Sequence, residues 1–421
     1  QVGTIPMTGV SIANQLLLIF NLCILGATAG AGIFTAQFYG KGDQEGVRHT
    51  FRFKMMLALS LFVIGTGVFL AFGDTLIAQY LHEGGDTGDI AATAQYGADY
   101  LKVMLWGLLP FAVQQAYASN LRETGETMLP MKAGIVAIFV NLVFNYILIF
   151  GHFGAPAMGV EGAALATVIS RYVECAIVIS WTHRHTEQAR FIVGAYKSMH
   201  VPGTLVGEIF KRGMPLLVNE FLWSAGMAML TQAYSTRGLA VVAALNICTT
   251  IANLFNVVWI AMGTAVSIIV GQHLGAGDFD KAEESCWRIL TFSVLSAVGM
   301  GILMAACSTL FPAMYNTTQE VRNIATGLLL MVAASGPLHA FCHASYFTLR
   351  SGGRTGITFL FDSVYTWCVP AVLAYVLSRY TDADVVTMYF CIQFIDVAKL
   401  IIGLFMLRSD FWANDLTASN K

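Results

Sequence analysis

Long apolar stretches constrain the fold of this chain more than any other feature. Runs of about 18 or more residues, long enough to cross roughly 30 Å of hydrocarbon as a helix, recur from one end of the sequence to the other. The strands of a membrane barrel would instead alternate apolar and polar residues over about 10 positions. Ile135 to Phe150 shows no such alternation. We therefore predict an all-α polytopic membrane protein.

The composition supports this class. Hydrophobic residues make up 56% of the chain and charged residues 11%, whereas a soluble domain carries about 25% charge. A net charge of −2 gives no reason to expect a nucleic-acid partner. The cysteines are scattered, mostly within apolar runs and without a CxxC spacing. We interpret them as small core residues rather than disulfides or metal ligands.

Eleven apolar spans are expected. They lie at 5–39, 53–80, 92–120, 130–150, 161–182, 204–236, 240–272, 288–313, 323–349, 356–378 and 385–407.

Two sequence motifs occur twice. Gln37–Asp43 recurs as Gln272–Asp278, and Leu121–Thr127 recurs as Leu349–Thr355. Such duplication predicts two copies of one structural unit. Basic residues concentrate in the loops on the side of the Gln-x-x-Gly motifs, whereas His82–Asp89 is acidic. Cytoplasmic loops are rich in Lys and Arg, so both motifs are expected in the cytoplasm, and the two copies are parallel repeats.

The repeat predicts the domain organisation. We expect an N-lobe at 1–183, a cytoplasmic linker at 184–203, a C-lobe at 204–407 and a cytoplasmic tail at 408–421. The second copy has two spans before its Gln-x-x-Gly motif and the first copy has one. We therefore expect a further helix before Gln1, which would make twelve spans as six plus six. Two equivalent lobes around a cleft are typical of a transporter that works by alternating access, and no enzymatic nucleophile or metal cluster is evident.

Together these motifs resemble the multidrug and toxic compound extrusion (MATE) transporters. The Gln-x-x-Gly-x-Gly-Asp loops, both Leu-Arg-x-x-Gly-x-Thr segments and Phe150–Thr167 carry the resemblance over essentially the whole chain, and Met214–Ser224 resembles a bacterial branch. The resemblance implies a protein of the bacterial inner membrane that exports organic, often cationic compounds in exchange for H⁺ or Na⁺. We expect small organic substrates and membrane lipids as partners, no nucleic acid, no cofactor and a monomer.

Two other functions stay open. A flippase for lipid-linked or amphipathic precursors, from the same wider superfamily, would favour a cleft lined with arginines, and few basic residues lie within the spans. A membrane scaffold or receptor would show no transport.

Glu220 is the leading candidate for ion coupling. It lies in the middle of the 204–236 span, after Pro215 and beside Asn219. Ionisable residues inside a membrane are costly and indicate function by default. Glu220 could load a proton from one side and release it when a cation or drug arrives. The alternative is a neutral glutamic acid that only packs.

Two histidines, His339 and His343, are one helical turn apart and share a helix face. His339 stands where the resembling branches carry a coupling acid. A histidine can still carry a proton. The alternatives are core histidines or a metal site, for which no third ligand is evident.

Asn141 and Asn145 are also one turn apart. The resemblance implies a cation site that they share with Thr167, although Asn145 replaces an aspartate of that site. Amide oxygens can still coordinate sodium. The alternative is hydrogen bonding between helices.

The remaining polar residues suggest structure or substrate contact. Asp99 and Lys102, Arg171 and Glu174, and Asp396 and Lys399 are spaced to pair along a helix. Asp362 is expected to pair with Arg350 or Arg354, or to line the cleft. A cavity for cations would use flat aromatic faces and polar contacts. Candidates for it are Asn219, Trp223, Gln232, Asn246 and Phe255. The glycines of the Gln-x-x-Gly motifs are expected to end helices, and Asp43 and Asp278 to cap the next ones or pair with arginines.

Overall fold

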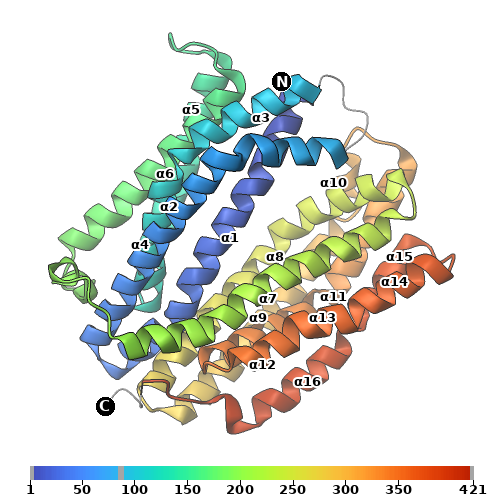
Figure 1. Ribbon diagram of the computed structural model, residues 1–421. Coiled ribbons are helices and arrows are strands. Elements are labelled where there is room, and N and C mark those ends of the chain that lie inside the picture. The colour runs from blue at the N-terminus through green and yellow to red at the C-terminus, as the bar shows by residue number, and fades with distance from the viewer. Residues whose placement is uncertain (1–3, 84–89, 418–421) are drawn as a thin grey trace. The chain divides into compact units, whose positions relative to one another are not determined.

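The computed structural model describes residues 4–83 and 90–417, and this part of the chain contains helices and no strands (Figure 1). Within it, nine helical segments are long and apolar enough to cross a membrane. The predicted all-α polytopic membrane fold is confirmed. The acidic residues expected at 84–89 and the end of the tail at 418–421 lie outside the described residues.

The chain divides into two compact units. The first comprises the residues up to Thr35 together with Asp43–Ile209, and the second comprises Ala36–Gly42 together with the residues from Phe210 onward. The long first helix therefore begins in the first unit, and its last turns belong to the second.

The first unit consists of long helices and two short 3₁₀ turns. They are α1 (Thr4–Lys41), α2 (Gln44–Glu83), α3 (Ile90–Leu105), α4 (Leu108–Glu123), α5 (Met128–Phe150), α6 (Gly159–Arg184), η1 (Arg190–Ile192) and η2 (Ala195–Lys197). The span expected at 92–120 is interrupted between α3 and α4. Pro110 explains the break, because proline has no N–H to donate and its ring clashes with the carbonyl four residues earlier, that of Trp106.

The second unit contains the remaining helices, several of them interrupted, and α7 begins in the first unit and continues into the second from Phe210. They are α7 (Gly203–Ser235), α8 (Leu239–Gly275), α9 (Phe279–Ala306), α10 (Leu310–Ala313), α11 (Gln319–Ser351), α12 (Thr355–Phe359), η3 (Leu360–Val364), α13 (Tyr365–Cys368), α14 (Pro370–Tyr380), α15 (Val385–Phe394), α16 (Val397–Arg408) and η4 (Asp410–Trp412). The η3 segment is a single π-helical turn between α12 and α13. A second irregularity separates α15 from α16 at Ile395 and Asp396.

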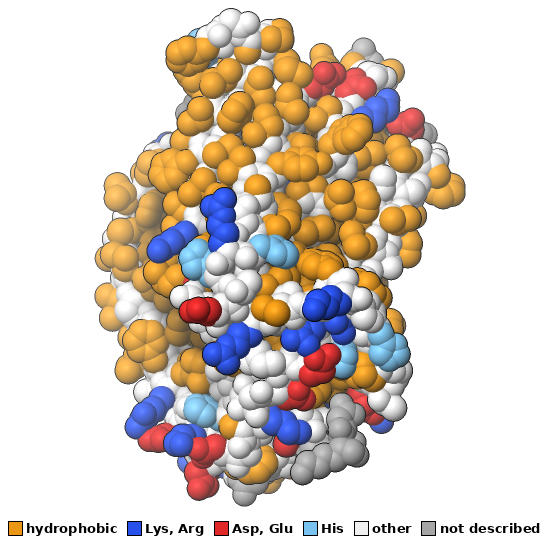
Figure 2. Space-filling view, turned by 90° about the vertical axis from the view of Figure 1, so that its left-hand side faces the viewer, with side chains coloured by type: hydrophobic (Ala, Val, Ile, Leu, Met, Phe, Trp, Pro, Cys, Tyr) orange, Lys and Arg blue, Asp and Glu red, His pale blue; other side chains and the backbone are white. Residues whose placement is uncertain are grey.

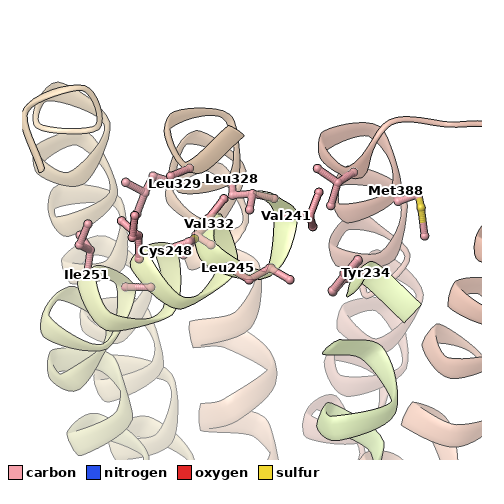
Figure 3. Close-up of a cluster of buried hydrophobic side chains, with 14 of the residues drawn as sticks. Tyr234, Val241, Leu245, Cys248, Ile251, Leu328, Leu329, Val332 and Met388 are labelled. Atoms are coloured by element: carbon pink, nitrogen blue, oxygen red, sulfur yellow. The ribbon is translucent and has the colours of Figure 1, made fainter. Parts of the chain in front are cut away.

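A cluster of buried apolar side chains forms the core of the second unit (Figure 3). Leu245 and Cys248 of α8 meet Leu328 and Val332 of α11, with Met388 of α15 beside them. The buried positions of α8 recur every three or four residues, as expected for a helix with one face toward a core. The opposite face of α8 is therefore left for other contacts.

The surface fits a membrane protein. On the face in Figure 2, hydrophobic side chains cover a broad area, and most of the charged side chains gather in the lower part. A water-soluble protein rarely exposes contiguous apolar patches larger than a few hundred Å².

The aspartates of the repeated motif cap helices, as predicted. The N–H of Gly46 donates to Asp43 Oδ1 at 2.9 Å. The N–H of Lys281 donates to Asp278 Oδ1 at 3.3 Å, and the Lys281 ammonium lies 2.6 Å from Asp278 Oδ2. The hydrogen bond from this ammonium is the main reason that the pKa of Asp278 is lower than usual.

The first glycine of each motif has a role that the sequence did not reveal. A Cβ on Gly40 would lie 1.8 Å from the carbonyl oxygen of Gln272, and a Cβ on Gly275 would lie 1.9 Å from that of Gln37. The ends of α1 and α8 thus approach backbone to backbone, each glycine against the glutamine of the other motif. Only glycine permits so close an approach.

The hydrogen bonds of Gln37 explain why the motif has a glutamine three residues before Gly40. The side chain of Gln37 is fully buried. Its amide donates to the carbonyl of Ser351 at 3.0 Å, and its Oε1 accepts from the N–H of Leu416 at 2.7 Å. Gln37 therefore ties the end of α1 to the end of α11 and to the C-terminal segment.

Candidate functional site

The first unit brings Asn141, Asn145 and Thr167 together. Asn141 and Asn145 lie on α5 and Thr167 on the neighbouring α6 (Figure 1). Asn141 Nδ2 donates to Thr167 Oγ1 at 3.3 Å, and Asn145 Nδ2 donates to Asn141 Oδ1 at 2.9 Å. Asn145 Oδ1 is buried and has no hydrogen-bond partner among the described residues. The cluster can therefore offer neutral oxygen ligands to a sodium ion, but it contributes no carboxylate.

In the second unit, Asn219 of α7 forms hydrogen bonds with polar residues of neighbouring elements. Only 1% of its surface is exposed. Its Nδ2 donates to Asp362 Oδ2 at 3.0 Å and to Tyr346 Oη at 3.3 Å. Its Oδ1 accepts from Ser363 Oγ at 2.7 Å. Asn219 thus lies inside a polar network instead of on an open surface, and it joins α7 to α11 and η3.

Glu220 follows Asn219 on α7 and is half-buried. Its carboxylate forms no hydrogen bond or ion pair with any other residue that the structure describes. The positive charge of Arg350 on α11 attracts it, and the carboxylate of Asp362 repels it. Glu220 is therefore an acidic side chain that is attracted by one charge and repelled by another. Its carboxylate has no hydrogen-bond partner among the described residues.

The partners of Asp362, Asp396 and Lys399 differ from those predicted. Lys399 Nζ donates to Asp362 Oδ1 at 2.7 Å, so the expected pairing of Asp362 with an arginine is wrong. The expected pair of Asp396 and Lys399 is wrong too, because Asp396 Oδ2 lies 3.5 Å from His339 Nε2. The helix is broken at Asp396, so the helical spacing on which that pairing rested does not hold there.

The two histidines of α11 contact different helices. His339 faces Asp396, at the start of α16. The ring of His343 meets the edge of Trp259 on α8 at a centroid distance of 5.2 Å, and its Nδ1 is buried without a partner in the described chain. Gly263 makes room for this ring, since a Cβ there would lie 2.5 Å from His343 Nδ1. No group of three potential metal-ligating side chains occurs among the described residues.

The predicted cavity residues fall into two groups. Trp223, Gln232 and Asn246 are exposed. Phe255 is buried against Phe311 at a ring distance of 5.9 Å. With Asn256 and Trp259, among others, it lines a narrow crevice within the second unit.

One feature missed in the sequence is a polar stripe on the exposed side of α8. It comprises Asn246, Thr249, Thr250 and Asn253, all exposed. Their spacing places them on one side of the helix, opposite the core face. This spacing of polar residues inside an apolar run is the sequence feature from which the stripe could have been predicted.

The first unit carries a matching stripe on α1. When the repeated motifs are aligned, Ser11, Asn14 and Gln15 correspond to Asn246, Thr249 and Thr250, and all three are exposed. Equivalent positions of both repeats therefore present polar side chains outward from a membrane helix.

Several other charged residues of the first unit form ion pairs or hydrogen bonds within that unit. Asp99 and Lys102 pair at 3.7 Å, as predicted. Arg171 donates instead to the carbonyl of Gly107 at 3.2 Å, and Glu174 accepts from Gln114 at 2.8 Å. Lys54 of α2 is fully buried and pairs with Glu123 of α4.

Comparisons with known proteins agree with one another. The MatE family model matches residues 1–147 and 215–376. A probable multidrug resistance protein NorM from Thermotoga maritima is 25% identical over 376 residues, which cover 89% of this chain and 78% of that protein. The probable multidrug resistance protein YoeA of Bacillus subtilis is 24% identical over 91% of this chain and 81% of its own length.

Solved structures show the same fold. An outward-facing multidrug resistance MATE family transporter of the MOP superfamily superposes with a TM-score of 0.87 at 18% identity, covering 96% of this chain and 88% of that one. A MATE protein solved in the straight conformation superposes with a TM-score of 0.85 at 18% identity, covering 97% of this chain and 88% of its own.

Proposed function

Because this chain belongs to the MatE family of multidrug and toxic compound extrusion transporters, we propose that it exports organic, often cationic compounds in exchange for protons or sodium ions. Its relatives are named as multidrug resistance proteins and come from bacteria, which supports drug export across a bacterial inner membrane. Two lobes that rock to expose the cleft alternately to each side would carry the substrate.

The observation that carries the proposal is the carboxylate of Glu220. It lies in the middle of α7 and is half-buried, and it forms no hydrogen bond or ion pair with the other described residues. A charge at such a position is costly and is retained for function. An unpaired carboxylate can bind a proton or an organic cation, and exchange of one for the other would couple the two fluxes.

Besides an ion-coupling group, an exporter needs a surface that contacts the substrate. The stripes on α1 and α8 can provide such a surface. Asn246 and Thr250 on α8, and Ser11 and Gln15 on α1, are polar and exposed. Polar groups facing lipid would lose hydrogen bonds to water without replacement. We infer that each stripe contacts substrate, because small hydroxyl and amide groups tolerate varied compounds.

Glu220→Gln tests the coupling role, because glutamine keeps the size of the side chain and removes the charge. Uptake of a fluorescent organic cation is measured in inverted vesicles, under a proton gradient alone and a sodium gradient alone. A coupling free energy of about 1–3 kcal/mol changes affinity about 5–150-fold, so uptake should fall by on the order of tenfold under the gradient that drives the wild type. The matched control is Glu161→Gln, an exposed acid in the first turn of α6. If the Glu220 variant kept both its uptake and its dependence on the gradient, this role would be excluded.

A further inference from the structure

The ion pair of Asp362 and Lys399 is a largely buried polar contact of the second unit. Lys399 Nζ lies 2.7 Å from Asp362 Oδ1, and the two side chains are only 16% and 10% exposed, Asp362 being the more exposed. Removing two charges from water costs several kcal/mol for each, which their attraction repays only in good geometry. A pair of apolar side chains would stabilise this position as well or better, so stability alone does not explain the pair.

Asp362 lies in an irregular turn of its helix, and Lys399 lies close to a break in its own. Asp362 and Ser363 belong to the π-helical turn η3, and such turns inside α-helices occur frequently at functional sites. Lys399 lies on α16, shortly after the break at Asp396. The hydroxyl of Tyr365 donates to the carbonyl of Ile395 at 2.9 Å. The turn that carries Asp362 is therefore joined to the break that precedes Lys399.

The ammonium group of Lys399 also lies over two aromatic rings. Its Nζ is 5.2 Å from the ring centre of Phe361 and 5.7 Å from that of Tyr365. Both distances lie within the range in which a ring attracts a cation. The ammonium would therefore keep favourable contacts if Asp362 became neutral.

Several titratable groups face Asp362 from the helices packed around it. They are Glu220 on α7, Cys342, His343 and Tyr346 on α11, and Lys399 on α16. Among them, Glu220 repels the Asp362 carboxylate, so protonation of either acid favours the charged form of the other. The two acids are linked structurally as well, because Asn219, which donates to Asp362, is the neighbour of Glu220 in the chain.

We propose that Asp362 is a second proton-binding carboxylate of the second unit, and that its charged form is held by Lys399 and opposed by the carboxylate of Glu220. This inference rests on the proposed export function and deepens it. When a proton binds, an O–H bond forms on Asp362 and Lys399 keeps its charge over the two rings. When an organic cation reaches Glu220, the proton on Asp362 returns to water and the ion pair forms again.

The test measures protons released when purified protein in weakly buffered detergent solution binds tetraphenylphosphonium, with a pH-sensitive dye as the readout. The double variant Asp362→Asn with Lys399→Gln removes both charges and leaves no unpaired ion. We expect it to bind the cation and to release about one proton per molecule fewer than the wild type, since a single coupled site is lost. The matched control is Asp278→Asn with Lys281→Gln, an ion pair of the same unit that lies on the surface. It should release as many protons as the wild type.

A second variant keeps the proposal testable if the double variant does not fold. Lys399→Arg preserves the charge and can hold the carboxylate through two parallel hydrogen bonds. A purely structural pair predicts an unchanged pH dependence of proton release, whereas a proton site predicts a shift toward lower pH. Full proton release by a folded double variant would overturn the proposal, as would an unshifted profile for Lys399→Arg. A wild type that transports the cation without releasing protons would overturn this proposal and leave export standing, whereas a wild type that transports no cation would refute the proposed function itself.

Discussion

At the scale of single residues, Asn145 shows what a missing charge means for an ion site. Its Oδ1 is buried beside Asn141 and Thr167, and no described residue donates a hydrogen bond to it. An unpaired buried acceptor has a cost of about 1–3 kcal/mol, which a bound cation would relieve. A neutral oxygen attracts sodium far less than a carboxylate does, so this cluster should bind the ion weakly.

Asn145→Asp should convert the cluster into a stronger sodium site. The thermal midpoint of the variant should rise in sodium chloride relative to choline chloride, and by more than that of the wild type. Ligand binding stabilises a protein by about 2.7 kcal/mol when the ligand is at 100 times its Kd. Asn246→Asp, on the exposed stripe of α8, controls for the added charge. Equal midpoints of the Asn145 variant in both salts would mean that the oxygens do not converge on a cation.

Some residues of the candidate site could be predicted from the sequence, and the partners of others could not. Glu220 and the Asn141–Thr167 cluster could be selected because polar residues inside apolar runs are unusual, and helical spacing related their neighbours. The partners of Lys399 and Asp396 could not be predicted, because spacing along a helix assumes a continuous helix. The ion pair of Lys399 joins helices that are separate in the sequence, and the chain is broken at Asp396.

At the scale of elements, the π-helical turn η3 acts as a one-residue insertion. It aims Asp362 and Ser363 at Asn219 while α12 and α13 on either side stay α-helical. Pro370 at the start of α14 invites a prediction of irregular structure, but nothing in the sequence of Leu360–Val364 marks a π turn. Interactions with α7 and α16 hold this conformation, so it could not be predicted locally.

Deleting Leu360, whose side chain is 57% exposed, should restore a regular helix. The contacts of Asp362 with Asn219 and Lys399 should then be lost. Because the turn holds one extra residue, the flanking helices should keep their faces, and the variant should fold but release fewer protons on binding tetraphenylphosphonium. Deleting the similarly exposed Val372 of α14 is the control. It rotates every later residue of that helix by about 100° and should lower the thermal midpoint much more. Equal destabilisation by the two deletions would show that η3 is not a local insertion.

At the scale of the whole molecule, the duplication was the most informative property of the sequence. It correctly predicted the place of the helix-capping aspartates, and it is the basis for expecting two parallel repeats. It could not reveal that the two Gln-x-x-Gly motifs touch, because a repeat relates equivalent positions and says nothing of their distance. The contact between the ends of α1 and α8 depends on Gly40 and Gly275, where any Cβ would overlap the opposite backbone.

This contact should open during transport if substrates enter from the ends of α1 and α8 that carry the two motifs, so a covalent link across it should stop export. Ala36 and Gly271 are suited to a disulfide, because a Cβ on Gly271 would lie 3.2 Å from that of Ala36, slightly below the usual separation of about 3.5–4.5 Å. In the variant Ala36→Cys with Gly271→Cys, oxidation should reduce efflux of a cationic dye to background, and a reductant should restore it.

Thr348→Cys provides the matched control. Its new thiol would lie near the native Cys286, whose Sγ is 3.4 Å from Thr348 Oγ1, and would link α9 to α11 inside one packed unit. That disulfide should leave efflux unchanged, because α9 and α11 lie wholly within the second unit, whereas α1 continues from the first unit into the second. Normal efflux by fully cross-linked Ala36→Cys with Gly271→Cys would show instead that the two motifs stay together throughout the cycle. The substrate path would then have to open elsewhere, and the close approach of Gly40 and Gly275 would be a fixed pivot.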